Sequence, residues 1–225
     1  MFMSRIAINS RRRGAVKLLA NRHAMHAAVM SSFAPGTPTE SENGRVLWRV
    51  DRIDHSVDLL IVSPERPCLA HIAEQAGWST DNTWATREYA PFLTTIEAGA
   101  NYAFRLTANP THRVTTGTTK QIVGHKTVEH QRNWLVEKSE EAGFTILPSV
   151  ASTVGGITAP ALTLSDRDHS SFTRNRSRVT LTTTTYDGAL TVTDADAFRH
   201  TLGHGLGRAK GYGCGLLTVL PLPTS

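Results

Sequence analysis

The chain has 225 residues, of which 40% are hydrophobic, enough to form one domain or two of roughly 100 residues each. Its two cysteines, Cys68 and Cys214, exclude a disulfide scaffold and a cysteine-rich metal site, and they fit a reducing cytosol. The formal net charge of +5 favours anionic partners, and no apolar run reaches the length of about 18 residues that a membrane span requires. We therefore expect a cytoplasmic protein with no membrane partner.

The first half of the chain predicts a unit with the element order β-α-β-β-α-β. Its helices are indicated by apolar residues at three-residue spacing and by capping residues, and its strands by short β-branched runs. These elements are a strand over 3–9, a helix that follows Asn21 and places Ala27, Met30 and Phe33 in register, strands over 45–50 and 57–62, a helix over 68–76 that ends at Gly77, and a strand over 84–89.

The second half predicts the same order again if the two strands of its hairpin are counted as one. Its elements are a strand over 101–108, a polar basic loop to Lys126, a helix over 127–142, a strand over 144–150, a long loop over 151–177, strands over 178–186 and 189–193 around an Asp187-Gly188 turn, a helix over 194–202 that Gly203 ends, and a strand over 216–220. We therefore expect an α+β protein with two tandem ferredoxin-like domains, an N-terminal one over 1–95 and a C-terminal one over 96–225.

A glycine-rich run, GHGLGRAKGYGCGLL, occupies residues 203–217 near the C-terminus. It follows a predicted helix and leads into a strand, which is the reverse of a dinucleotide-binding fingerprint. Glycines allow close approach of the backbone to a polyanion, and cations within such a loop suit phosphate. We favour a loop that clamps a nucleic-acid backbone, and a structural loop that closes a small domain is the alternative. The candidate RNA-binding residues in the run are Gly205, Gly207, Arg208, Lys210, Gly211 and Gly213.

A pair of histidines, His23 and His26, lies in an N-terminal stretch that is rich in arginine and has no acidic residue before Glu40. Three-residue spacing on a helix places both imidazoles on one face, where one can accept and the other donate a proton. Arg22 beside them is a candidate RNA contact. The alternatives are a metal site, which lacks a nearby carboxylate or thiol ligand, and two surface histidines without a role.

Three arginines, Arg174, Arg176 and Arg178, alternate in the segment FTRNRSRV. On one strand, alternation would place all three side chains on one face. Such a stripe can follow RNA phosphates, and a solvated polar face is the alternative interpretation.

Taken together, the segments MSRIAIN, NRHAMH, YAFRLTANP, YDGALTVTD and GLGRAKGYGCGLL resemble the CRISPR repeat-processing endoribonucleases of type I-E systems, the CasE family of the RAMP superfamily. The resemblance covers nearly the whole chain. It implies two tandem ferredoxin-like domains and cleavage of the repeat stem-loop of precursor CRISPR RNA without metal or cofactor. It also implies that the product RNA is retained with other subunits in a surveillance complex called Cascade.

The resemblance also assigns residues. The catalytic histidine of the family falls on His26, whereas a tyrosine often stands where this chain has His23. The family's glycine-rich loop falls on residues 205–215 with Lys210 at its basic position, and the arginines 174, 176 and 178 fall near its basic hairpin. Two other functions remain open, namely a non-catalytic RNA-binding subunit on the same fold and a metal-dependent nuclease built on His23 and His26.

Overall fold

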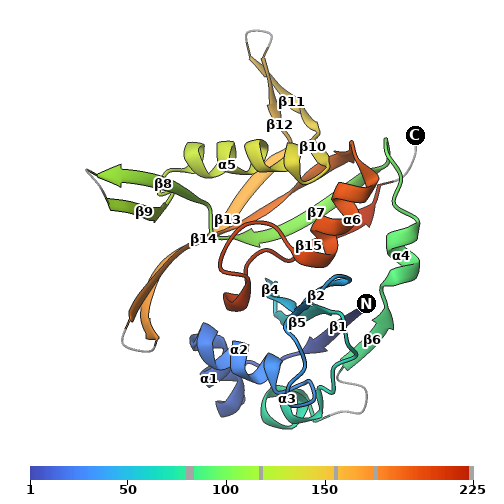
Figure 1. Ribbon diagram of the computed structural model, residues 1–225, viewed down its shortest axis with the longest axis vertical. Helices are drawn as coiled ribbons and strands as arrows, with labels where there is room; N and C mark the ends of the chain where they lie inside the picture. Colours follow the sequence, from blue (N-terminus) through green and yellow to red (C-terminus); the bar gives the residue numbers. More distant parts are fainter. Residues whose placement is uncertain (80–83, 117–118, 155–156, 175–176, 223–225) are drawn as a thin grey trace. The chain divides into compact units, whose positions relative to one another are not determined.

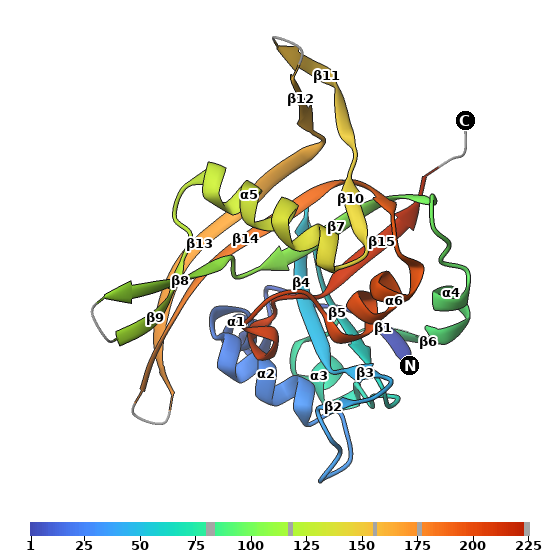
Figure 2. The same ribbon diagram turned by 45° about the horizontal axis from the view of Figure 1, so that its top comes forward.

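The computed structural model describes residues 1–79, 84–116, 119–154, 157–174 and 177–222. These residues form a mixed α and β fold with several antiparallel sheets and six α-helices (Figure 1; Figure 2). The chain divides into two compact units. Unit 1 contains Met1–Thr95, Gly203–Gly205 and Lys210–Leu216, and unit 2 contains Ile96–Leu202, Leu206–Ala209 and Leu217–Ser225. No helix among the described residues is long and apolar enough to cross a membrane.

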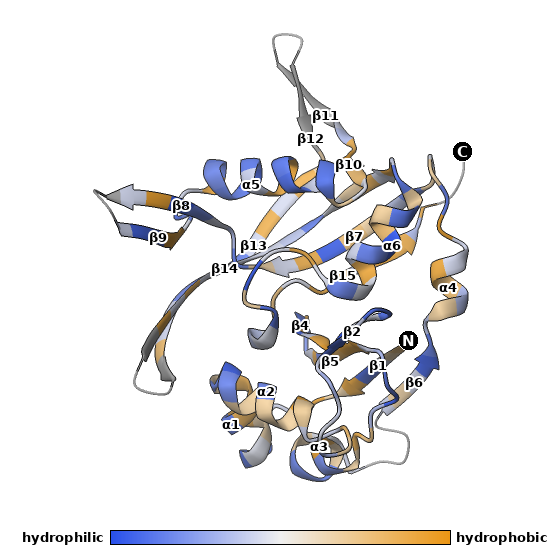
Figure 3. Ribbon diagram, in the orientation of Figure 1, coloured by the Kyte–Doolittle hydropathy of each residue, from blue (hydrophilic) through white to orange (hydrophobic). Residues whose placement is uncertain are grey.

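Unit 1 is built on a four-stranded antiparallel sheet. Its strands are β1 (Phe2–Ala7), β4 (Leu47–Ile53), β5 (Ser56–Ser63) and β6 (Trp84–Glu88), in the order β4-β5-β1-β6. A two-stranded ribbon, β2 (Glu40–Ser41) with β3 (Gly44–Arg45), precedes β4. The central strand β5 is largely hydrophobic, while the edge strand β6 is largely hydrophilic (Figure 3). The expected strands of the first half are thereby confirmed.

Four helices belong to unit 1: α1 (Arg13–Ala20), α2 (Arg22–Met30), α3 (Ala70–Ala76) and α4 (Ala90–Thr94). As expected, Asn21 caps α2, since its side chain accepts hydrogen bonds from the backbone N–H groups of His23 and Ala24. Helix α1 has no such capping signal in the sequence, because Arg12 holds its N-cap position and donates from its side chain to two carbonyl oxygens near the end of α3.

The core of unit 1 joins one face of the sheet to these helices. Buried residues of α1, α2 and α3 pack with buried residues of β1, β4 and β5 in one cluster. Met25 and Val29 of α2 are buried there, which leaves the opposite side of α2 to carry polar residues. The packing therefore fixes the direction in which the polar residues of α2 point.

Unit 2 repeats the same sheet order with different strands. Its path is β10-β14-β7-β15, formed by β10 (Phe144–Ile146), β14 (Ser177–Val192), β7 (Asn101–Ala108) and β15 (Leu217–Pro221), and β13 (Leu162–Arg174) also pairs with β14. Two helices accompany this sheet, α5 (Val128–Glu141), which Thr127 caps as expected, and α6 (Ala195–His204), whose first N–H groups bond to Asp194. Aromatic side chains of Tyr102, Phe104, Phe144 and Phe198 form its core. Helix α6 ends at His204 rather than at Leu202.

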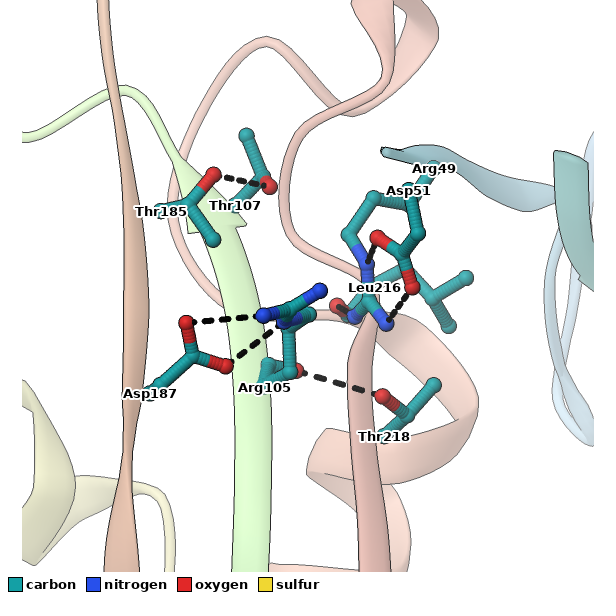
Figure 4. A network of polar contacts seen from close by, with 8 residues as sticks. All are labelled: Arg49, Asp51, Arg105, Thr107, Thr185, Asp187, Leu216 and Thr218. Carbon is teal, nitrogen blue, oxygen red and sulfur yellow. Dashed lines mark hydrogen bonds and ion pairs between the residues drawn. The ribbon is translucent and has the colours of Figure 1, made fainter. Parts of the chain in front are cut away.

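The predicted Asp187-Gly188 turn is wrong. Strand β14 runs through both residues without a break, and β7 lies beside it, with Arg105 opposite Asp187 and Phe104 opposite Gly188. The Arg105 guanidinium donates two hydrogen bonds to the Asp187 carboxylate (Figure 4). At Gly188 a Cβ atom would lie 2.4 Å from the Ala161 carbonyl oxygen, so the glycine permits close backbone packing rather than a turn.

Two segments predicted as loops are strands instead. The polar segment before Lys126 forms a hairpin of β8 (Thr111–Thr116) and β9 (Thr119–Gly124), and the segment over 151–177 contributes to β11 (Pro148–Val154), β12 (Ile157–Pro160) and β13. The β11–β12 ribbon extends away from the main sheet of unit 2 in both views (Figure 1; Figure 2). Strands β8, β9 and β13 carry threonine and charged residues in place of a sustained apolar alternation, which explains why the pattern suggested loops there.

Candidate functional site

Helix α2 carries the two candidate histidines and Arg22. His26 is half-buried, whereas His23, one turn earlier at the start of the helix, is exposed. Arg22 and His26 are four residues apart, so they share one face of the helix. In the described part of the chain, no hydrogen bond or ring contact joins the His23 side chain to the glycine-rich run.

The glycine-rich run returns to α2 through a short 3₁₀ turn, η1 (Lys210–Tyr212), which belongs to unit 1. The rings of His26 and Tyr212 have centroids 6.4 Å apart and planes tilted by 55°. At Gly211, a Cβ atom would lie 3.6 Å from Cε1 of His26 and 3.8 Å from each ring nitrogen. Arg22 donates a hydrogen bond of 2.9 Å from Nη1 to the carbonyl oxygen of Tyr212. The structure therefore brings together His26, Arg22 and Gly211.

The residues after η1 are fixed by packing inside unit 1. Gly213 has a φ of +77°, and a Cβ atom there would lie 2.6 Å from the buried indole ring of Trp48. Cys214 is fully buried, and burial raises the pKa of its thiol to about 11, so the thiol is neutral and unsuited to act as a nucleophile near pH 7. Glycine at position 213 therefore serves the close contact with Trp48.

Arg49 anchors the end of the same segment. Its buried guanidinium donates to both carboxylate oxygens of Asp51, at 2.6 and 2.8 Å, and to the carbonyl oxygen of Leu216, at 2.8 Å. Figure 4 shows this guanidinium between its two partners. The two parallel hydrogen bonds to Asp51 compensate the buried charge of the guanidinium, and the bond to Leu216 links that residue to strand β4.

Lys210 is the cation of η1. Its pKa is lowered, first because partial burial disfavours the charged ammonium and then because Arg45 repels it, while the carboxylate of Glu40 acts in the opposite direction. Arg45 and Glu40 form an ion pair of 2.6 Å. An incompletely solvated ammonium gains much from an incoming anion, so this position suits a phosphate group.

The other candidates of the glycine-rich run are spread over both units. Gly205 belongs to unit 1, and a Cβ atom there would lie 2.8 Å from the Leu47 side chain. Gly207 belongs to unit 2, and a Cβ atom there would lie 3.0 Å from the Trp134 ring. Arg208, in unit 2, is exposed and forms an isolated β-bridge with Asn109. Packing against the protein is a sufficient reason for glycine at 205 and 207, and RNA contact there stays a prediction.

The prediction that Arg174, Arg176 and Arg178 share one strand is wrong. β13 ends at Arg174 and β14 begins at Ser177, and Arg178 lies opposite Thr173 on the neighbouring strand. Arg176 lies outside the described residues. The backbone thus places Arg174 and Arg178 near the end of one long antiparallel hairpin in unit 2.

The sequence interpretation missed Tyr212 and Arg49. Tyr212 is the tyrosine of the glycine-rich run and has a glycine on each side, and this pattern could have marked it as a candidate site residue. No sequence pattern indicated Arg49, because its partner Leu216 is far away in the sequence. No group of three or more histidine, cysteine, aspartate or glutamate side chains is placed to hold a metal ion among the residues that the structure describes.

This arrangement can transfer a proton and stabilise an anion. The imidazole of His26 can act as a general acid or base, and Lys210 is one residue before Gly211, the glycine whose backbone faces that imidazole. A phosphate diester is a substrate that needs both actions in one step.

Comparison with known proteins places the chain in a family. It is 26% identical over 223 residues to the CRISPR-associated endoribonuclease Cse3 of Thermus thermophilus, with 98% of this chain and 100% of the relative covered. A structure of Thermus thermophilus Cse3, bound to an RNA that represents a pre-cleavage complex, has a TM-score of 0.76 at 24% identity and 98% coverage of both chains. A chain of a CRISPR RNA-guided surveillance complex in a pre-nicking state has a TM-score of 0.64 at 22% identity, with 99% of this chain and 100% of that chain covered. The family model described as CRISPR associated protein matches residues 1–221, and the chain therefore belongs to this family.

Proposed function

We propose that this protein is a metal-independent endoribonuclease that cuts the repeat stem-loop of precursor CRISPR RNA. Its membership of the CRISPR associated protein family supports this, as does its similarity along the whole chain to a relative named as an endoribonuclease. The observation that carries the proposal is the position of His26, whose ring lies so near Gly211 that a Cβ atom there would be at an ordinary van der Waals distance from it.

The proposed reaction uses the nucleophile that RNA itself supplies. The 2′-oxygen forms a bond to the adjacent phosphorus and loses its proton, and the bond from phosphorus to the 5′-oxygen breaks as that oxygen gains a proton. The products carry a 2′,3′-cyclic phosphate and a 5′-hydroxyl. His26 transfers one of these protons, and the ammonium of Lys210 stabilises the charge on the phosphorane.

The second proton transfer is assigned to His23. It lies on the same helix as His26, three residues earlier, and an exposed imidazole can exchange protons with the substrate or with water. His23 therefore serves as the acid–base partner of His26 in this proposal.

Several cations and glycines are proposed to bind the RNA backbone. Arg22 places a positive charge on the face of α2 that holds His26, and the end of the β13–β14 hairpin carries arginines on both strands. Recognition of an RNA stem through its shape and phosphates fits such a set. The residues assigned to RNA binding are Arg22, Arg174, Arg176, Arg178, Gly205, Gly207, Arg208, Lys210, Gly211 and Gly213.

We further propose that the molecule consists of two ferredoxin-like domains, over 1–95 and 96–225. The supporting observation is that the main sheet of each unit has the same strand order, with the first and third strands of the β-α-β-β-α-β unit in the centre. The protein is assigned to the cytoplasm, where it would retain the mature guide RNA within Cascade. Its likeness in fold to a chain of a surveillance complex accords with this partner.

The test is incubation of the purified protein with a cognate repeat hairpin in EDTA, with parallel reactions in Mg²⁺. Cleavage at one position at the same rate in both conditions is expected. Dependence on the added metal would contradict the mechanism, and binding without cleavage in either condition would identify a non-catalytic RNA-binding subunit.

A further inference from the structure

Tyr212 lies beside the ring of His26. The two ring centroids are 6.4 Å apart, and a Cβ atom at Gly211, next to Tyr212 in the chain, would lie 3.6 Å from Cε1 of the same imidazole. An imidazole on a helix can rotate about two side-chain torsions, and close neighbours restrict that rotation.

The position of Tyr212 is itself fixed from two directions. Arg22 donates a hydrogen bond to its carbonyl oxygen from the face of α2 that carries His26. On the other side, Gly213 packs against Trp48 and Cys214 is fully buried. The tyrosine is therefore held by the same helix as the histidine that it faces, and the distance between their rings is set by short local contacts.

We propose that Tyr212 is a positioning residue for His26, and this inference rests on the proposed function. Its aromatic ring holds the imidazole in the orientation needed for proton transfer, and the hydroxyl group is not required. Arg22 supports this role by fixing the backbone of Tyr212. Proton transfer requires a well-aligned donor and acceptor, so a loosened imidazole reduces the rate of cleavage without changing how tightly RNA binds.

The test compares Tyr212→Leu, which removes the ring, with Tyr212→Phe, which keeps it, in single-turnover cleavage at saturating repeat hairpin. We expect Tyr212→Leu to lower the rate by about tenfold and Tyr212→Phe to stay within about threefold of the wild type, since small misplacements of catalytic groups cost up to about 10²-fold. The dissociation constant should remain within about twofold for both. Phe92→Leu, a half-buried aromatic change in α4, is the matched control and should cleave normally.

A double-mutant cycle identifies the route of the effect. In a His26→Ala background, Tyr212→Leu should cause no further loss, because the group that it positions is already absent. Histidine ring signals in NMR spectra supply a second readout, since the His26 resonances should shift in Tyr212→Leu through loss of the neighbouring ring even without RNA. If Tyr212→Leu does not fold, Tyr212→Met takes its place in the same cycle.

Four results would overturn the inference while leaving the proposed function intact. They are wild-type cleavage by Tyr212→Leu, an equal loss in Tyr212→Phe, weaker RNA binding at an unchanged saturated rate, and additive losses in the cycle. Failure of the wild-type protein to cleave would instead refute the proposed function, and the NMR comparison would still report on the positioning of His26.

Discussion

His26 is the side chain on which the proposed chemistry depends most. Replacing it with alanine removes a proton-transfer group while the helix remains anchored in the core by Met25 and Val29. We expect His26→Ala to lower single-turnover cleavage by about 10²-fold or more, with hairpin binding little changed. His55→Ala, at an exposed histidine in the turn between β4 and β5, is the matched control and should cleave normally. Wild-type-like cleavage by His26→Ala would contradict the assignment.

His23 poses a different question, since it lies one turn before His26 and its side chain forms no hydrogen bond or ring contact with η1 among the described residues. If both imidazoles transfer protons, the rate of cleavage should depend on pH as a bell-shaped curve, because one must be neutral and the other charged. We expect His23→Tyr to keep substantial activity and to lose one limb of that curve, while His23→Ala loses more activity. An unchanged pH–rate curve in His23→Tyr, together with full activity of His23→Ala, would show that His23 takes no part.

For individual residues, the sequence predicted local roles better than it predicted contacts between residues far apart in the chain. Asn21 as a helix cap followed from local pattern, because capping involves residues two and three positions away. The contact of His26 with Gly211 and Tyr212 joins residues far apart in the chain, and no local pattern encodes it.

Among the secondary-structure elements, strand β14 differs most from its prediction, because it passes through Asp187-Gly188 without a turn. A Cβ atom at Gly188 would lie 2.4 Å from the Ala161 carbonyl oxygen and 3.0 Å from the Phe104 ring, so Gly188→Ala requires backbone movement. We expect a loss of about 1–3 kcal/mol in the free energy of unfolding, measured by denaturant titration. Gly203→Ala is the control, since Gly203 has no positive φ and a Cβ atom there would meet no atom closer than 3.3 Å, in the flexible side chain of Met1. A loss at Gly188 no larger than that at Gly203 would count against the close packing.

The β13–β14 hairpin gives a second prediction at this scale. Arg174 and Arg178 lie on its two strands near the connecting end, where both would add positive charge to an RNA-binding surface. The double variant Arg174→Ala with Arg178→Ala should weaken hairpin binding and lower the slope of log K against log salt by about 0.7–0.9 for each phosphate that it no longer neutralises. The control is Arg52→Ala with Arg87→Ala, at exposed or partly exposed arginines of unit 1. Unchanged binding over several salt concentrations would make these arginines a solvated surface.

The errors in predicting elements share one physical cause. Asp-Gly is a strong local turn signal, but pairing of β14 with β7 from Thr184 to Thr191, including the Arg105–Asp187 ion pair, overrides it. Strands β8 and β9 alternate too few apolar residues to be distinguished from a loop. In both cases the partner strand decides the structure, and the local sequence does not contain the partner.

For the whole molecule, the positions along the chain of the strands that form the two main sheets are what the sequence predicted best. The two main sheets, β4-β5-β1-β6 and β10-β14-β7-β15, arise from apolar alternation and helix caps that are visible locally. The division of the glycine-rich run between the units was not foreseen, since Gly205 and Lys210 belong to unit 1 while Leu206–Ala209 belong to unit 2. A run of glycines shows where the chain can bend, and the packing of Leu47, Trp48 and Trp134 decides where it bends.

The central claim is that the RNA supplies its own nucleophile, and one measurement tests it most directly. The substrate is a repeat hairpin with a single 2′-deoxy substitution at the nucleotide before the scissile phosphate, compared with the unmodified hairpin in EDTA. We predict that the modified hairpin binds as tightly but is not cut, and that the unmodified one yields 2′,3′-cyclic phosphate and 5′-hydroxyl ends. Cleavage of the deoxy hairpin at the same position, or products with 3′-hydroxyl and 5′-phosphate ends, would contradict it.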